Sequence, residues 1–176
     1  MKKYEFTGET KTVDLWSRVA TLHRIRAVAE FGLVKVGDLG GWIEKEENLS
    51  HDGKAWISGD AEIWGNAEIW GNAKIWGNAK ISGDAKISGD AEIFSVRHVL
   101  VVGPIGSRNA YTTFFRDKDN EICVKCGCFL GKIDKFLEKV TQTHGDSKYA
   151  LVYRAAVEVA KLQIDLFGEA PKDADE

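Results

Sequence analysis

Residues 57–92 read ISGDAE, IWGNAE, IWGNAK, IWGNAK, ISGDAK and ISGDAE, which are six copies of one six-residue repeat. Ile stands first in every copy and again at Ile93, and Gly stands third, followed by Asn or Asp and then by Ala. A period of six fits neither an α-helix nor a long strand, whose side-chain periods are about 3.6 and 2. The repeat therefore predicts short strands separated by corners. Ile fills the interior, Ala fits where the corner narrows, and Gly-Asn or Gly-Asp adopts the positive-φ backbone of the corner.

This motif resembles the hexapeptide repeat of left-handed parallel β-helices, in which three hexads make one triangular coil of eighteen residues. If the resemblance holds, residues eighteen apart stack, and no like charges face each other. The expected stacked pairs are Glu62–Lys80, Glu68–Lys86, Lys74–Glu92, Asp60–Asn78, Asn66–Asp84 and Asn72–Asp90.

Trp64, Trp70 and Trp76 follow the inward Ile of three successive hexads, so they are expected to point outward from three faces of one coil. A belt of exposed Trp is unusual on a monomer. Three interpretations remain open. The flanks of the same chain could cover the belt, identical protomers could meet there, or the rings could form a platform for a carbohydrate or another ligand.

Two coils need caps at their ends, and the flanking segments are the candidates. The expected fold is mainly β with an α/β C-terminal part. Its core is a short left-handed parallel β-helix, which we expect to assemble as a homotrimer. The expected domains are a β cap (residues 1–50), the β-helix (51–94), an α/β domain (95–168) and a disordered acidic tail (169–176).

The α/β domain is expected to begin with a buried strand over residues 99–102 and a loop over residues 103–109. A hairpin over residues 111–128 and a helix over residues 131–143, stopped at Gly145, follow. A second helix over residues 147–167 carries two apolar stripes, the second including Val159, Leu162 and Leu166. We interpret a helix that is apolar on two faces as buried on both, which favours an oligomer.

Composition narrows the possible functions. A net charge of −3 excludes a broadly basic nucleic-acid binder, so nucleic acid is not an expected partner. No apolar run approaches the roughly 18 residues of a membrane span. The three cysteines, Cys123, Cys126 and Cys128, are an odd and bunched set that predicts a reducing cytoplasm rather than a disulfide framework. They contain a single CxxC, whereas a structural zinc site needs four ligands, so we expect neither metal nor cofactor.

The segment Gly106-Ser107-Arg108-Asn109 is the best ligand candidate in the sequence. A turn after Gly exposes backbone N–H groups, Ser adds a hydroxyl, and Arg can grip a phosphate with two hydrogen bonds. The predicted ligand-binding set for a small anion is Arg97, His98, Ser107, Arg108, Asn109, Thr112 and Arg116.

No catalytic set emerges from the sequence. Hexapeptide-repeat acyltransferases place a His on or beside their coils, but none of the four His residues lies in the clear repeats. His98, just past the last hexad, would be the only plausible base. A hexapeptide-type acyltransferase and a virion or scaffold protein remain the alternatives to a binding protein.

Several motifs outside the repeat also look familiar. Residues 22–26, 37–44 and 48–51, followed by the hexads, resemble a group of phage and prophage proteins with an N-terminal cap and a variable number of hexads. Residues 106–109, 125–129 and 143–146 resemble a small α/β module found in the same setting. This resemblance implies a phage-type accessory protein in the host cytoplasm. We expect it to act against host defence, either by sequestering a small anionic, nucleotide-like ligand or by blocking a host protein.

Overall fold

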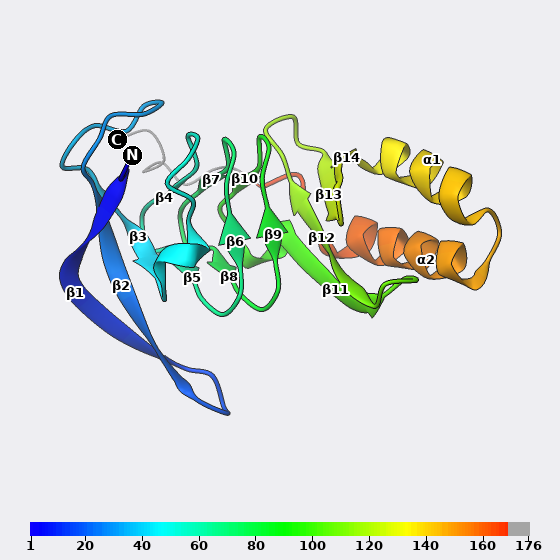
Figure 1. Cartoon of the computed structure of the whole chain (residues 1–176), viewed down its shortest axis with the longest axis horizontal. Helices are drawn as coiled ribbons and strands as arrows, with labels where there is room; N and C mark the ends of the chain where they lie inside the picture. Colours follow the sequence, from blue (N-terminus) through cyan, green and yellow to red (C-terminus); the bar gives the residue numbers. More distant parts are fainter. Residues whose placement is uncertain (169–176) are drawn as a thin grey trace.

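The computed structural model describes residues 1–168, so the expected acidic tail lies outside the described residues. The chain is mainly β, with its two α-helices together at one end (Figure 1). An N-terminal hairpin occupies the opposite end, and the repeats lie between them. Within residues 1–168, neither helix has the length and apolar character needed to cross a membrane.

The N-terminal segment forms a long antiparallel hairpin of β1 (Tyr4–Asp14) and β2 (Val19–Ala27). The strand β3 (Leu39–Ile43) pairs antiparallel with β2 and parallel with the repeat strand β5 (Glu62–Ile63). Residues 1–50, where a β cap was expected, thus contribute three strands. One continuous sheet carries the N-terminal segment onto the repeats.

The repeats form seven strands of two residues each. They are β4 (Trp56–Ile57), β5 (Glu62–Ile63), β6 (Glu68–Ile69), β7 (Lys74–Ile75), β8 (Lys80–Ile81), β9 (Lys86–Ile87) and β10 (Glu92–Ile93). Strands three places apart pair in parallel, which gives the rows β4–β7–β10, β5–β8 and β6–β9. One turn of the chain therefore takes eighteen residues and passes through three rows.

The predicted stacking of residues eighteen apart is confirmed wherever a pairing defines it. Glu62 pairs with Lys80, Glu68 with Lys86 and Lys74 with Glu92. At the corners, the side-chain amide of Asn66 donates to Asp84 over 3.2 Å, and that of Asn72 donates to Asp90 over 3.1 Å. Opposite charges and donor–acceptor pairs thus line up along the stack.

The corner glycines and the interior isoleucines explain why the repeat adopts this path. Gly71 has φ of +72°, and a Cβ atom there would lie 2.8 Å from the backbone nitrogen of Gly89 in the next turn. Only glycine both adopts this positive φ readily and leaves room for the neighbouring turn. Ile57, Ile63 and the five later repeat isoleucines are each at most 2% exposed. Burying each of these side chains contributes about 1.5–3 kcal/mol to the free energy of unfolding.

The C-terminal segment is an antiparallel sheet with both helices on one side. Its strands are β11 (Val99–Ile105), β12 (Ala110–Arg116), β13 (Ile122–Cys126) and β14 (Phe129–Lys132), in that order. The helices are α1 (Ile133–His144) and α2 (Lys148–Gln163). Phe114 packs among helix residues, whereas its neighbour Phe115 packs into the core of the repeats. Because adjacent strand residues face opposite sides, this sheet is clamped between repeats and helices.

Several sequence-based expectations for this segment are wrong. The second helix ends at Gln163 rather than at residue 167. Its face containing Tyr153 and Val157 is buried within the single chain, and burial of its second face in an oligomer stays a prediction. On its other face Leu162 is 90% exposed. A short strand, β14, precedes α1 where only helix was expected, and the strand over residues 99–102 is half-buried rather than buried. The expected stop of the first helix at Gly145 is confirmed by a positive φ of +57°.

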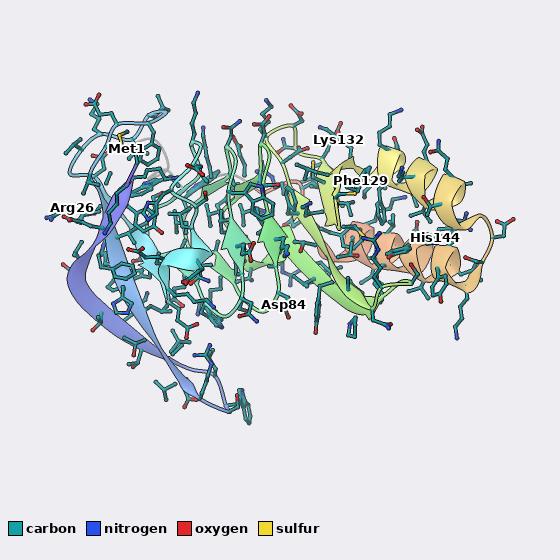
Figure 2. The ribbon with its side chains drawn as sticks, in the orientation of Figure 1. Met1, Arg26, Asp84, Phe129, Lys132 and His144 are labelled. Carbon is teal, nitrogen blue, oxygen red and sulfur yellow. The ribbon has the colours of Figure 1, made fainter. Side chains whose placement is uncertain are left out.

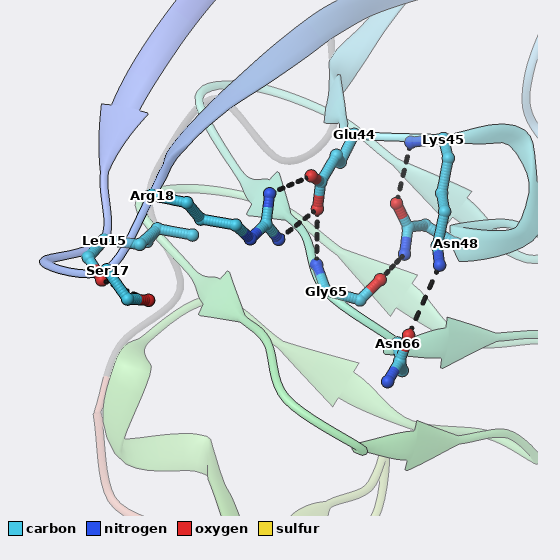
Figure 3. A network of polar contacts seen from close by, with 8 residues as sticks. All are labelled: Leu15, Ser17, Arg18, Glu44, Lys45, Asn48, Gly65 and Asn66. Carbon is cyan, nitrogen blue, oxygen red and sulfur yellow. Dashed lines mark hydrogen bonds and ion pairs between the residues drawn. The ribbon is translucent and has the colours of Figure 1, made fainter.

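Side chains tie the N-terminal hairpin to the repeats (Figure 3). Arg18, near the hairpin tip, donates to both carboxylate oxygens of Glu44, and Glu44 accepts the backbone N–H of Gly65 over 2.7 Å. The hydrogen bond from the Arg18 side chain is the main cause of the lowered pKa of Glu44. Asn48, fully buried in the short 3-10 helix η1 (Glu46–Asn48), donates its side-chain amide to the carbonyls of Gly65 and Ala67.

Candidate functional site

The loop between β11 and β12 is a tight turn at the far end of this hairpin from the repeats. Gly106 has φ of +76° and Asn109 has φ of +48°, and the Asn109 N–H donates to the Gly106 carbonyl over 3.2 Å. Ser107, Arg108 and Asn109 are all exposed. The turn thus presents a hydroxyl, a guanidinium and an amide to solvent, as predicted for residues 106–109.

Three stretches that are distant in sequence meet around one tyrosine of α2. A Cβ atom on Gly106 would lie 1.9 Å from the Tyr153 hydroxyl, so the turn rests directly on this side chain. The Cys126 thiol lies 3.9 Å from the same hydroxyl. The His144 ring stacks on the Tyr153 ring at 5.8 Å with a 27° tilt. Figure 2 labels His144 at the helical end of the molecule. The segments that resemble the phage-associated α/β module are therefore gathered around Tyr153.

The electrostatics of this cluster suit an anion. Tyr153 is 8% exposed, and its burial, reinforced by Cys126, raises its pKa to about 12. The phenol therefore keeps its proton at neutral pH and can donate a hydrogen bond. The charge of Arg108 acts in the opposite direction on the same pKa, which shows that the guanidinium lies within electrostatic range of the hydroxyl.

The remaining members of the predicted ligand set lie elsewhere. Arg97 and His98 precede β11, and Arg116 ends β12, so all three lie at the repeat end of the hairpin. Strands of seven residues span about 20 Å, which separates these side chains from the turn. The prediction of one site containing all seven residues is therefore wrong.

Arg116 and Thr112 have structural roles. Arg116 is 7% exposed, donates to the Glu92 carbonyl and to the Asn120 side chain, and lies over the ring of Phe94 at 5.0 Å. Thr112 is 1% exposed and donates to the Cys126 sulfur over 3.4 Å. Arg116 thus fastens the sheet to the last repeat, and Thr112 orients the thiol beside Tyr153.

His98 is also part of the core. It is 1% exposed, its Nδ1 accepts the Phe94 N–H over 3.2 Å, and its ring meets the Phe94 ring edge to face. Burial, aided by the charge of Arg116, lowers the pKa of His98 to about 4. A histidine buried in this way cannot contact a substrate, so His98 is not placed to act as the base of an acyl transfer.

The tryptophan belt is covered largely by its own chain. Trp76 is 9% exposed and packs against Phe94 at 5.0 Å, which favours the interpretation that the flanks of the same chain cover the belt. Trp64 packs against the cluster that the N-terminal hairpin forms with Trp42. Trp70 is half-buried, with the Lys125 ammonium 6.0 Å from its ring.

The predicted interface residues of α2 differ in their surroundings. Val159 is 50% exposed and Leu162 is 90% exposed, so both are available to a partner. Leu166 instead packs partly against the core of its own C-terminal segment. Two exposed apolar side chains near the end of one helix are compatible with the predicted oligomer, which stays a prediction.

The three cysteines are free thiols. Cys123 donates to the buried Asp117 carboxylate over 3.1 Å, and burial raises its pKa to about 12. Cys123 and Cys126 are partly buried, and Cys128 is exposed. No group of three or more metal-ligating side chains gathers anywhere in residues 1–168.

Comparison with known proteins adds no relative. The chain matches no protein-family model and no curated protein sequence.

Two features escaped the sequence analysis. One is Trp16 at the hairpin tip, which is fully exposed with φ of +63°. The other is a cleft that brings residues 46–51 against Trp70, and no local sequence pattern pairs these two segments.

Proposed function

We propose that this protein is a binding protein whose C-terminal α/β part takes a small anionic, nucleotide-like ligand at the turn over residues 106–109. The observation that carries the proposal is the convergence of this turn, Cys126 and His144 on Tyr153. Positioned donors around one exposed guanidinium form the chemistry that recognises phosphate.

Each group would have a separate role in this site. Arg108 would grip two phosphate oxygens, and the Ser107 hydroxyl and the backbone N–H groups of the turn would bind the remainder. The protonated Tyr153 hydroxyl, which lies beneath the turn, would donate a hydrogen bond to the ligand. Residues 93–168 contain eleven Lys and Arg but eight Asp and Glu, and this excess of positive charge favours binding of an anion at this end of the chain.

The biological role we propose is that of a phage-type counter-defence factor in the host cytoplasm, which sequesters a nucleotide signal or blocks a host protein. The support is the motif resemblance together with three free cysteines, which are typical of a reducing compartment. The buried position of His98 argues against an acyltransferase.

We further propose that the repeats form a left-handed β-helix and that the protein is a homotrimer. The support for the helix is the parallel pairing of residues eighteen apart in three rows. The support for the oligomer is the apolar side chains that α2 leaves exposed, with Leu151 at 59% and Leu162 at 90%.

Titration calorimetry of the full chain against a panel of cyclic and linear nucleotides tests the ligand. A saturable heat with at least one of them is expected. A pull-down from host lysate tests the alternative target in parallel. Absence of heat with every nucleotide would refute the anionic ligand, and an empty pull-down as well would refute the binding role.

A further inference from the structure

A second candidate site lies far from Tyr153, where the N-terminal segment meets the repeats. A cleft of about 600 Å³ opens between residues 46–51 and the strand β6. Leu49 and Ile69 lie beneath it, and both are at most 1% exposed. They are paired as a parallel bridge, and the Ser50 N–H donates to the Ile69 carbonyl over 2.9 Å. The backbone therefore fixes the shape of the cleft.

Trp70 gives this cleft an aromatic wall. Of the three repeat tryptophans, it alone lines this opening, since Trp64 and Trp76 are packed against other parts of the chain. Its ring already has an ammonium group near it, because Lys125 Nζ lies 6.0 Å from the ring centroid. A Trp ring is the side chain that attracts cations most strongly.

Carboxylates dominate the rim. Glu46, Glu47 and Glu68 all line the cleft. Glu46 has one cationic neighbour, the Lys2 ammonium at 3.6 Å, and the His51 Nε2 atom lies 3.9 Å from it. Within residues 1–168, neither Glu47 nor Glu68 forms an ion pair. Lys86 lies opposite Glu68 where β6 pairs with β9 but forms no ion pair with it, so among the described residues Glu46 alone of these three carboxylates has an ion-pair partner.

His51 does not neutralise this charge. Its Nδ1 accepts the Lys3 N–H over 3.1 Å, and its ring stacks on Tyr4 at 4.2 Å. Burial lowers the pKa of His51, so the ring is neutral around neutral pH. Nε2 then carries the ring proton and faces the rim as a neutral donor.

We infer that this cleft binds a small organic cation, with its ammonium or guanidinium group held between the Trp70 ring and the carboxylates of Glu47 and Glu68. The half-buried Trp70 ring is the apolar surface that the alkyl part of such a ligand, for example an alkyl polyamine, would contact. This site is separate from the anion site proposed above, and neither depends on the other.

NMR of the full chain tests the inference through the indole N–H signals of its tryptophans. The Trp70 signal is assigned from its loss in Trp70→Phe. Titration with spermidine is expected to shift this signal saturably, and added salt is expected to weaken the binding. Neutral glucose and inorganic phosphate, used as comparison ligands, are expected to leave the signal in place.

The double variant Glu47→Gln/Glu68→Gln is expected to bind spermidine about tenfold more weakly. Glu30→Gln/Glu138→Gln is the matched control, because it removes two exposed carboxylates elsewhere and should keep the wild-type affinity. Equal affinities in the two double variants, or no spermidine shift at Trp70, would overturn the inference. A shift with glucose but not with spermidine would overturn the cationic assignment and favour a sugar.

Discussion

Gly106 approaches Tyr153 so closely that a Cβ atom on the glycine would lie 1.9 Å from the phenolic oxygen. Gly106→Ala is therefore expected to lower the free energy of unfolding by about 2–4 kcal/mol, through the positive φ and the clash together. Gly127→Ala is the control, since Gly127 also has positive φ but a Cβ there would meet nothing within 4 Å. It should cost only about 1 kcal/mol. Chemical denaturation measures both, and equal losses would mean that the turn does not rest on Tyr153.

The corner glycines of the repeats allow a similar comparison. A Cβ at Gly71 would lie 2.8 Å from the Gly89 nitrogen, whereas a Cβ at Gly83 would meet nothing within 4 Å. Both residues have positive φ, so Ala at either position carries the same backbone strain. Gly71→Ala is expected to destabilise the protein by about 1–3 kcal/mol more than Gly83→Ala. If thermal and denaturant unfolding show Gly83→Ala to be the less stable variant, the close stacking of Gly71 on Gly89 described here is contradicted.

The buried His98 predicts a loss of stability in mild acid. Its pKa is about 4 in the folded chain and about 6.5 when unfolded. Between these values the unfolded chain binds a proton that the folded chain does not, so stability falls as pH decreases from about 6.5 to about 4. The contribution of His98 to this fall is about 3 kcal/mol.

The matched variant is His98→Asn, which keeps an acceptor for the Phe94 N–H but does not titrate. Its free energy of unfolding should depend less steeply on pH in that window than that of the wild-type chain, although it starts lower. Parallel pH profiles for the two proteins would show that His98 is not the group responsible.

The exposed end of α2 tests the proposed oligomer. Leu162 is 90% exposed, so Leu162→Glu costs a single chain little stability but places a charge in any interface formed there. Light scattering should report a trimer for the wild-type protein and a smaller species for this variant. Gln163→Glu, on the adjacent residue, should remain trimeric. A wild-type protein that is monomeric at micromolar concentration would refute the trimer.

The fold of the repeats could be predicted because its determinants are local. Gly at each corner and Ile six residues apart constrain the backbone within a single hexad, so the spacing predicts short strands and corners. The pairing of Ile57 with Ile75 was implied by the resemblance to β-helices, in which three hexads make one turn. The hairpin of β12 and β13 and the end of α1 at Gly145 were recognisable because their determinants are also local.

The candidate site could be predicted only in part, because it depends on long-range packing. The turn over residues 106–109 has a local signature, but nothing in the sequence places Tyr153 beneath it. Arg116 and His98 resemble ligand-binding residues in sequence, yet both are committed to Phe94 in the interior. Burial of a polar residue is decided by which segments meet, and a single sequence does not display this.

The most direct test of the proposed anion site compares two exposed arginines. Calorimetry with the nucleotide that binds best should show Arg108→Ala at least about tenfold weaker than wild type, because a charge-assisted pair of hydrogen bonds is lost. Arg97→Ala, with the same change of charge at the opposite end of β11, should bind as wild type does. Unchanged affinity in Arg108→Ala, or an equal loss in Arg97→Ala, would contradict a ligand site at this turn.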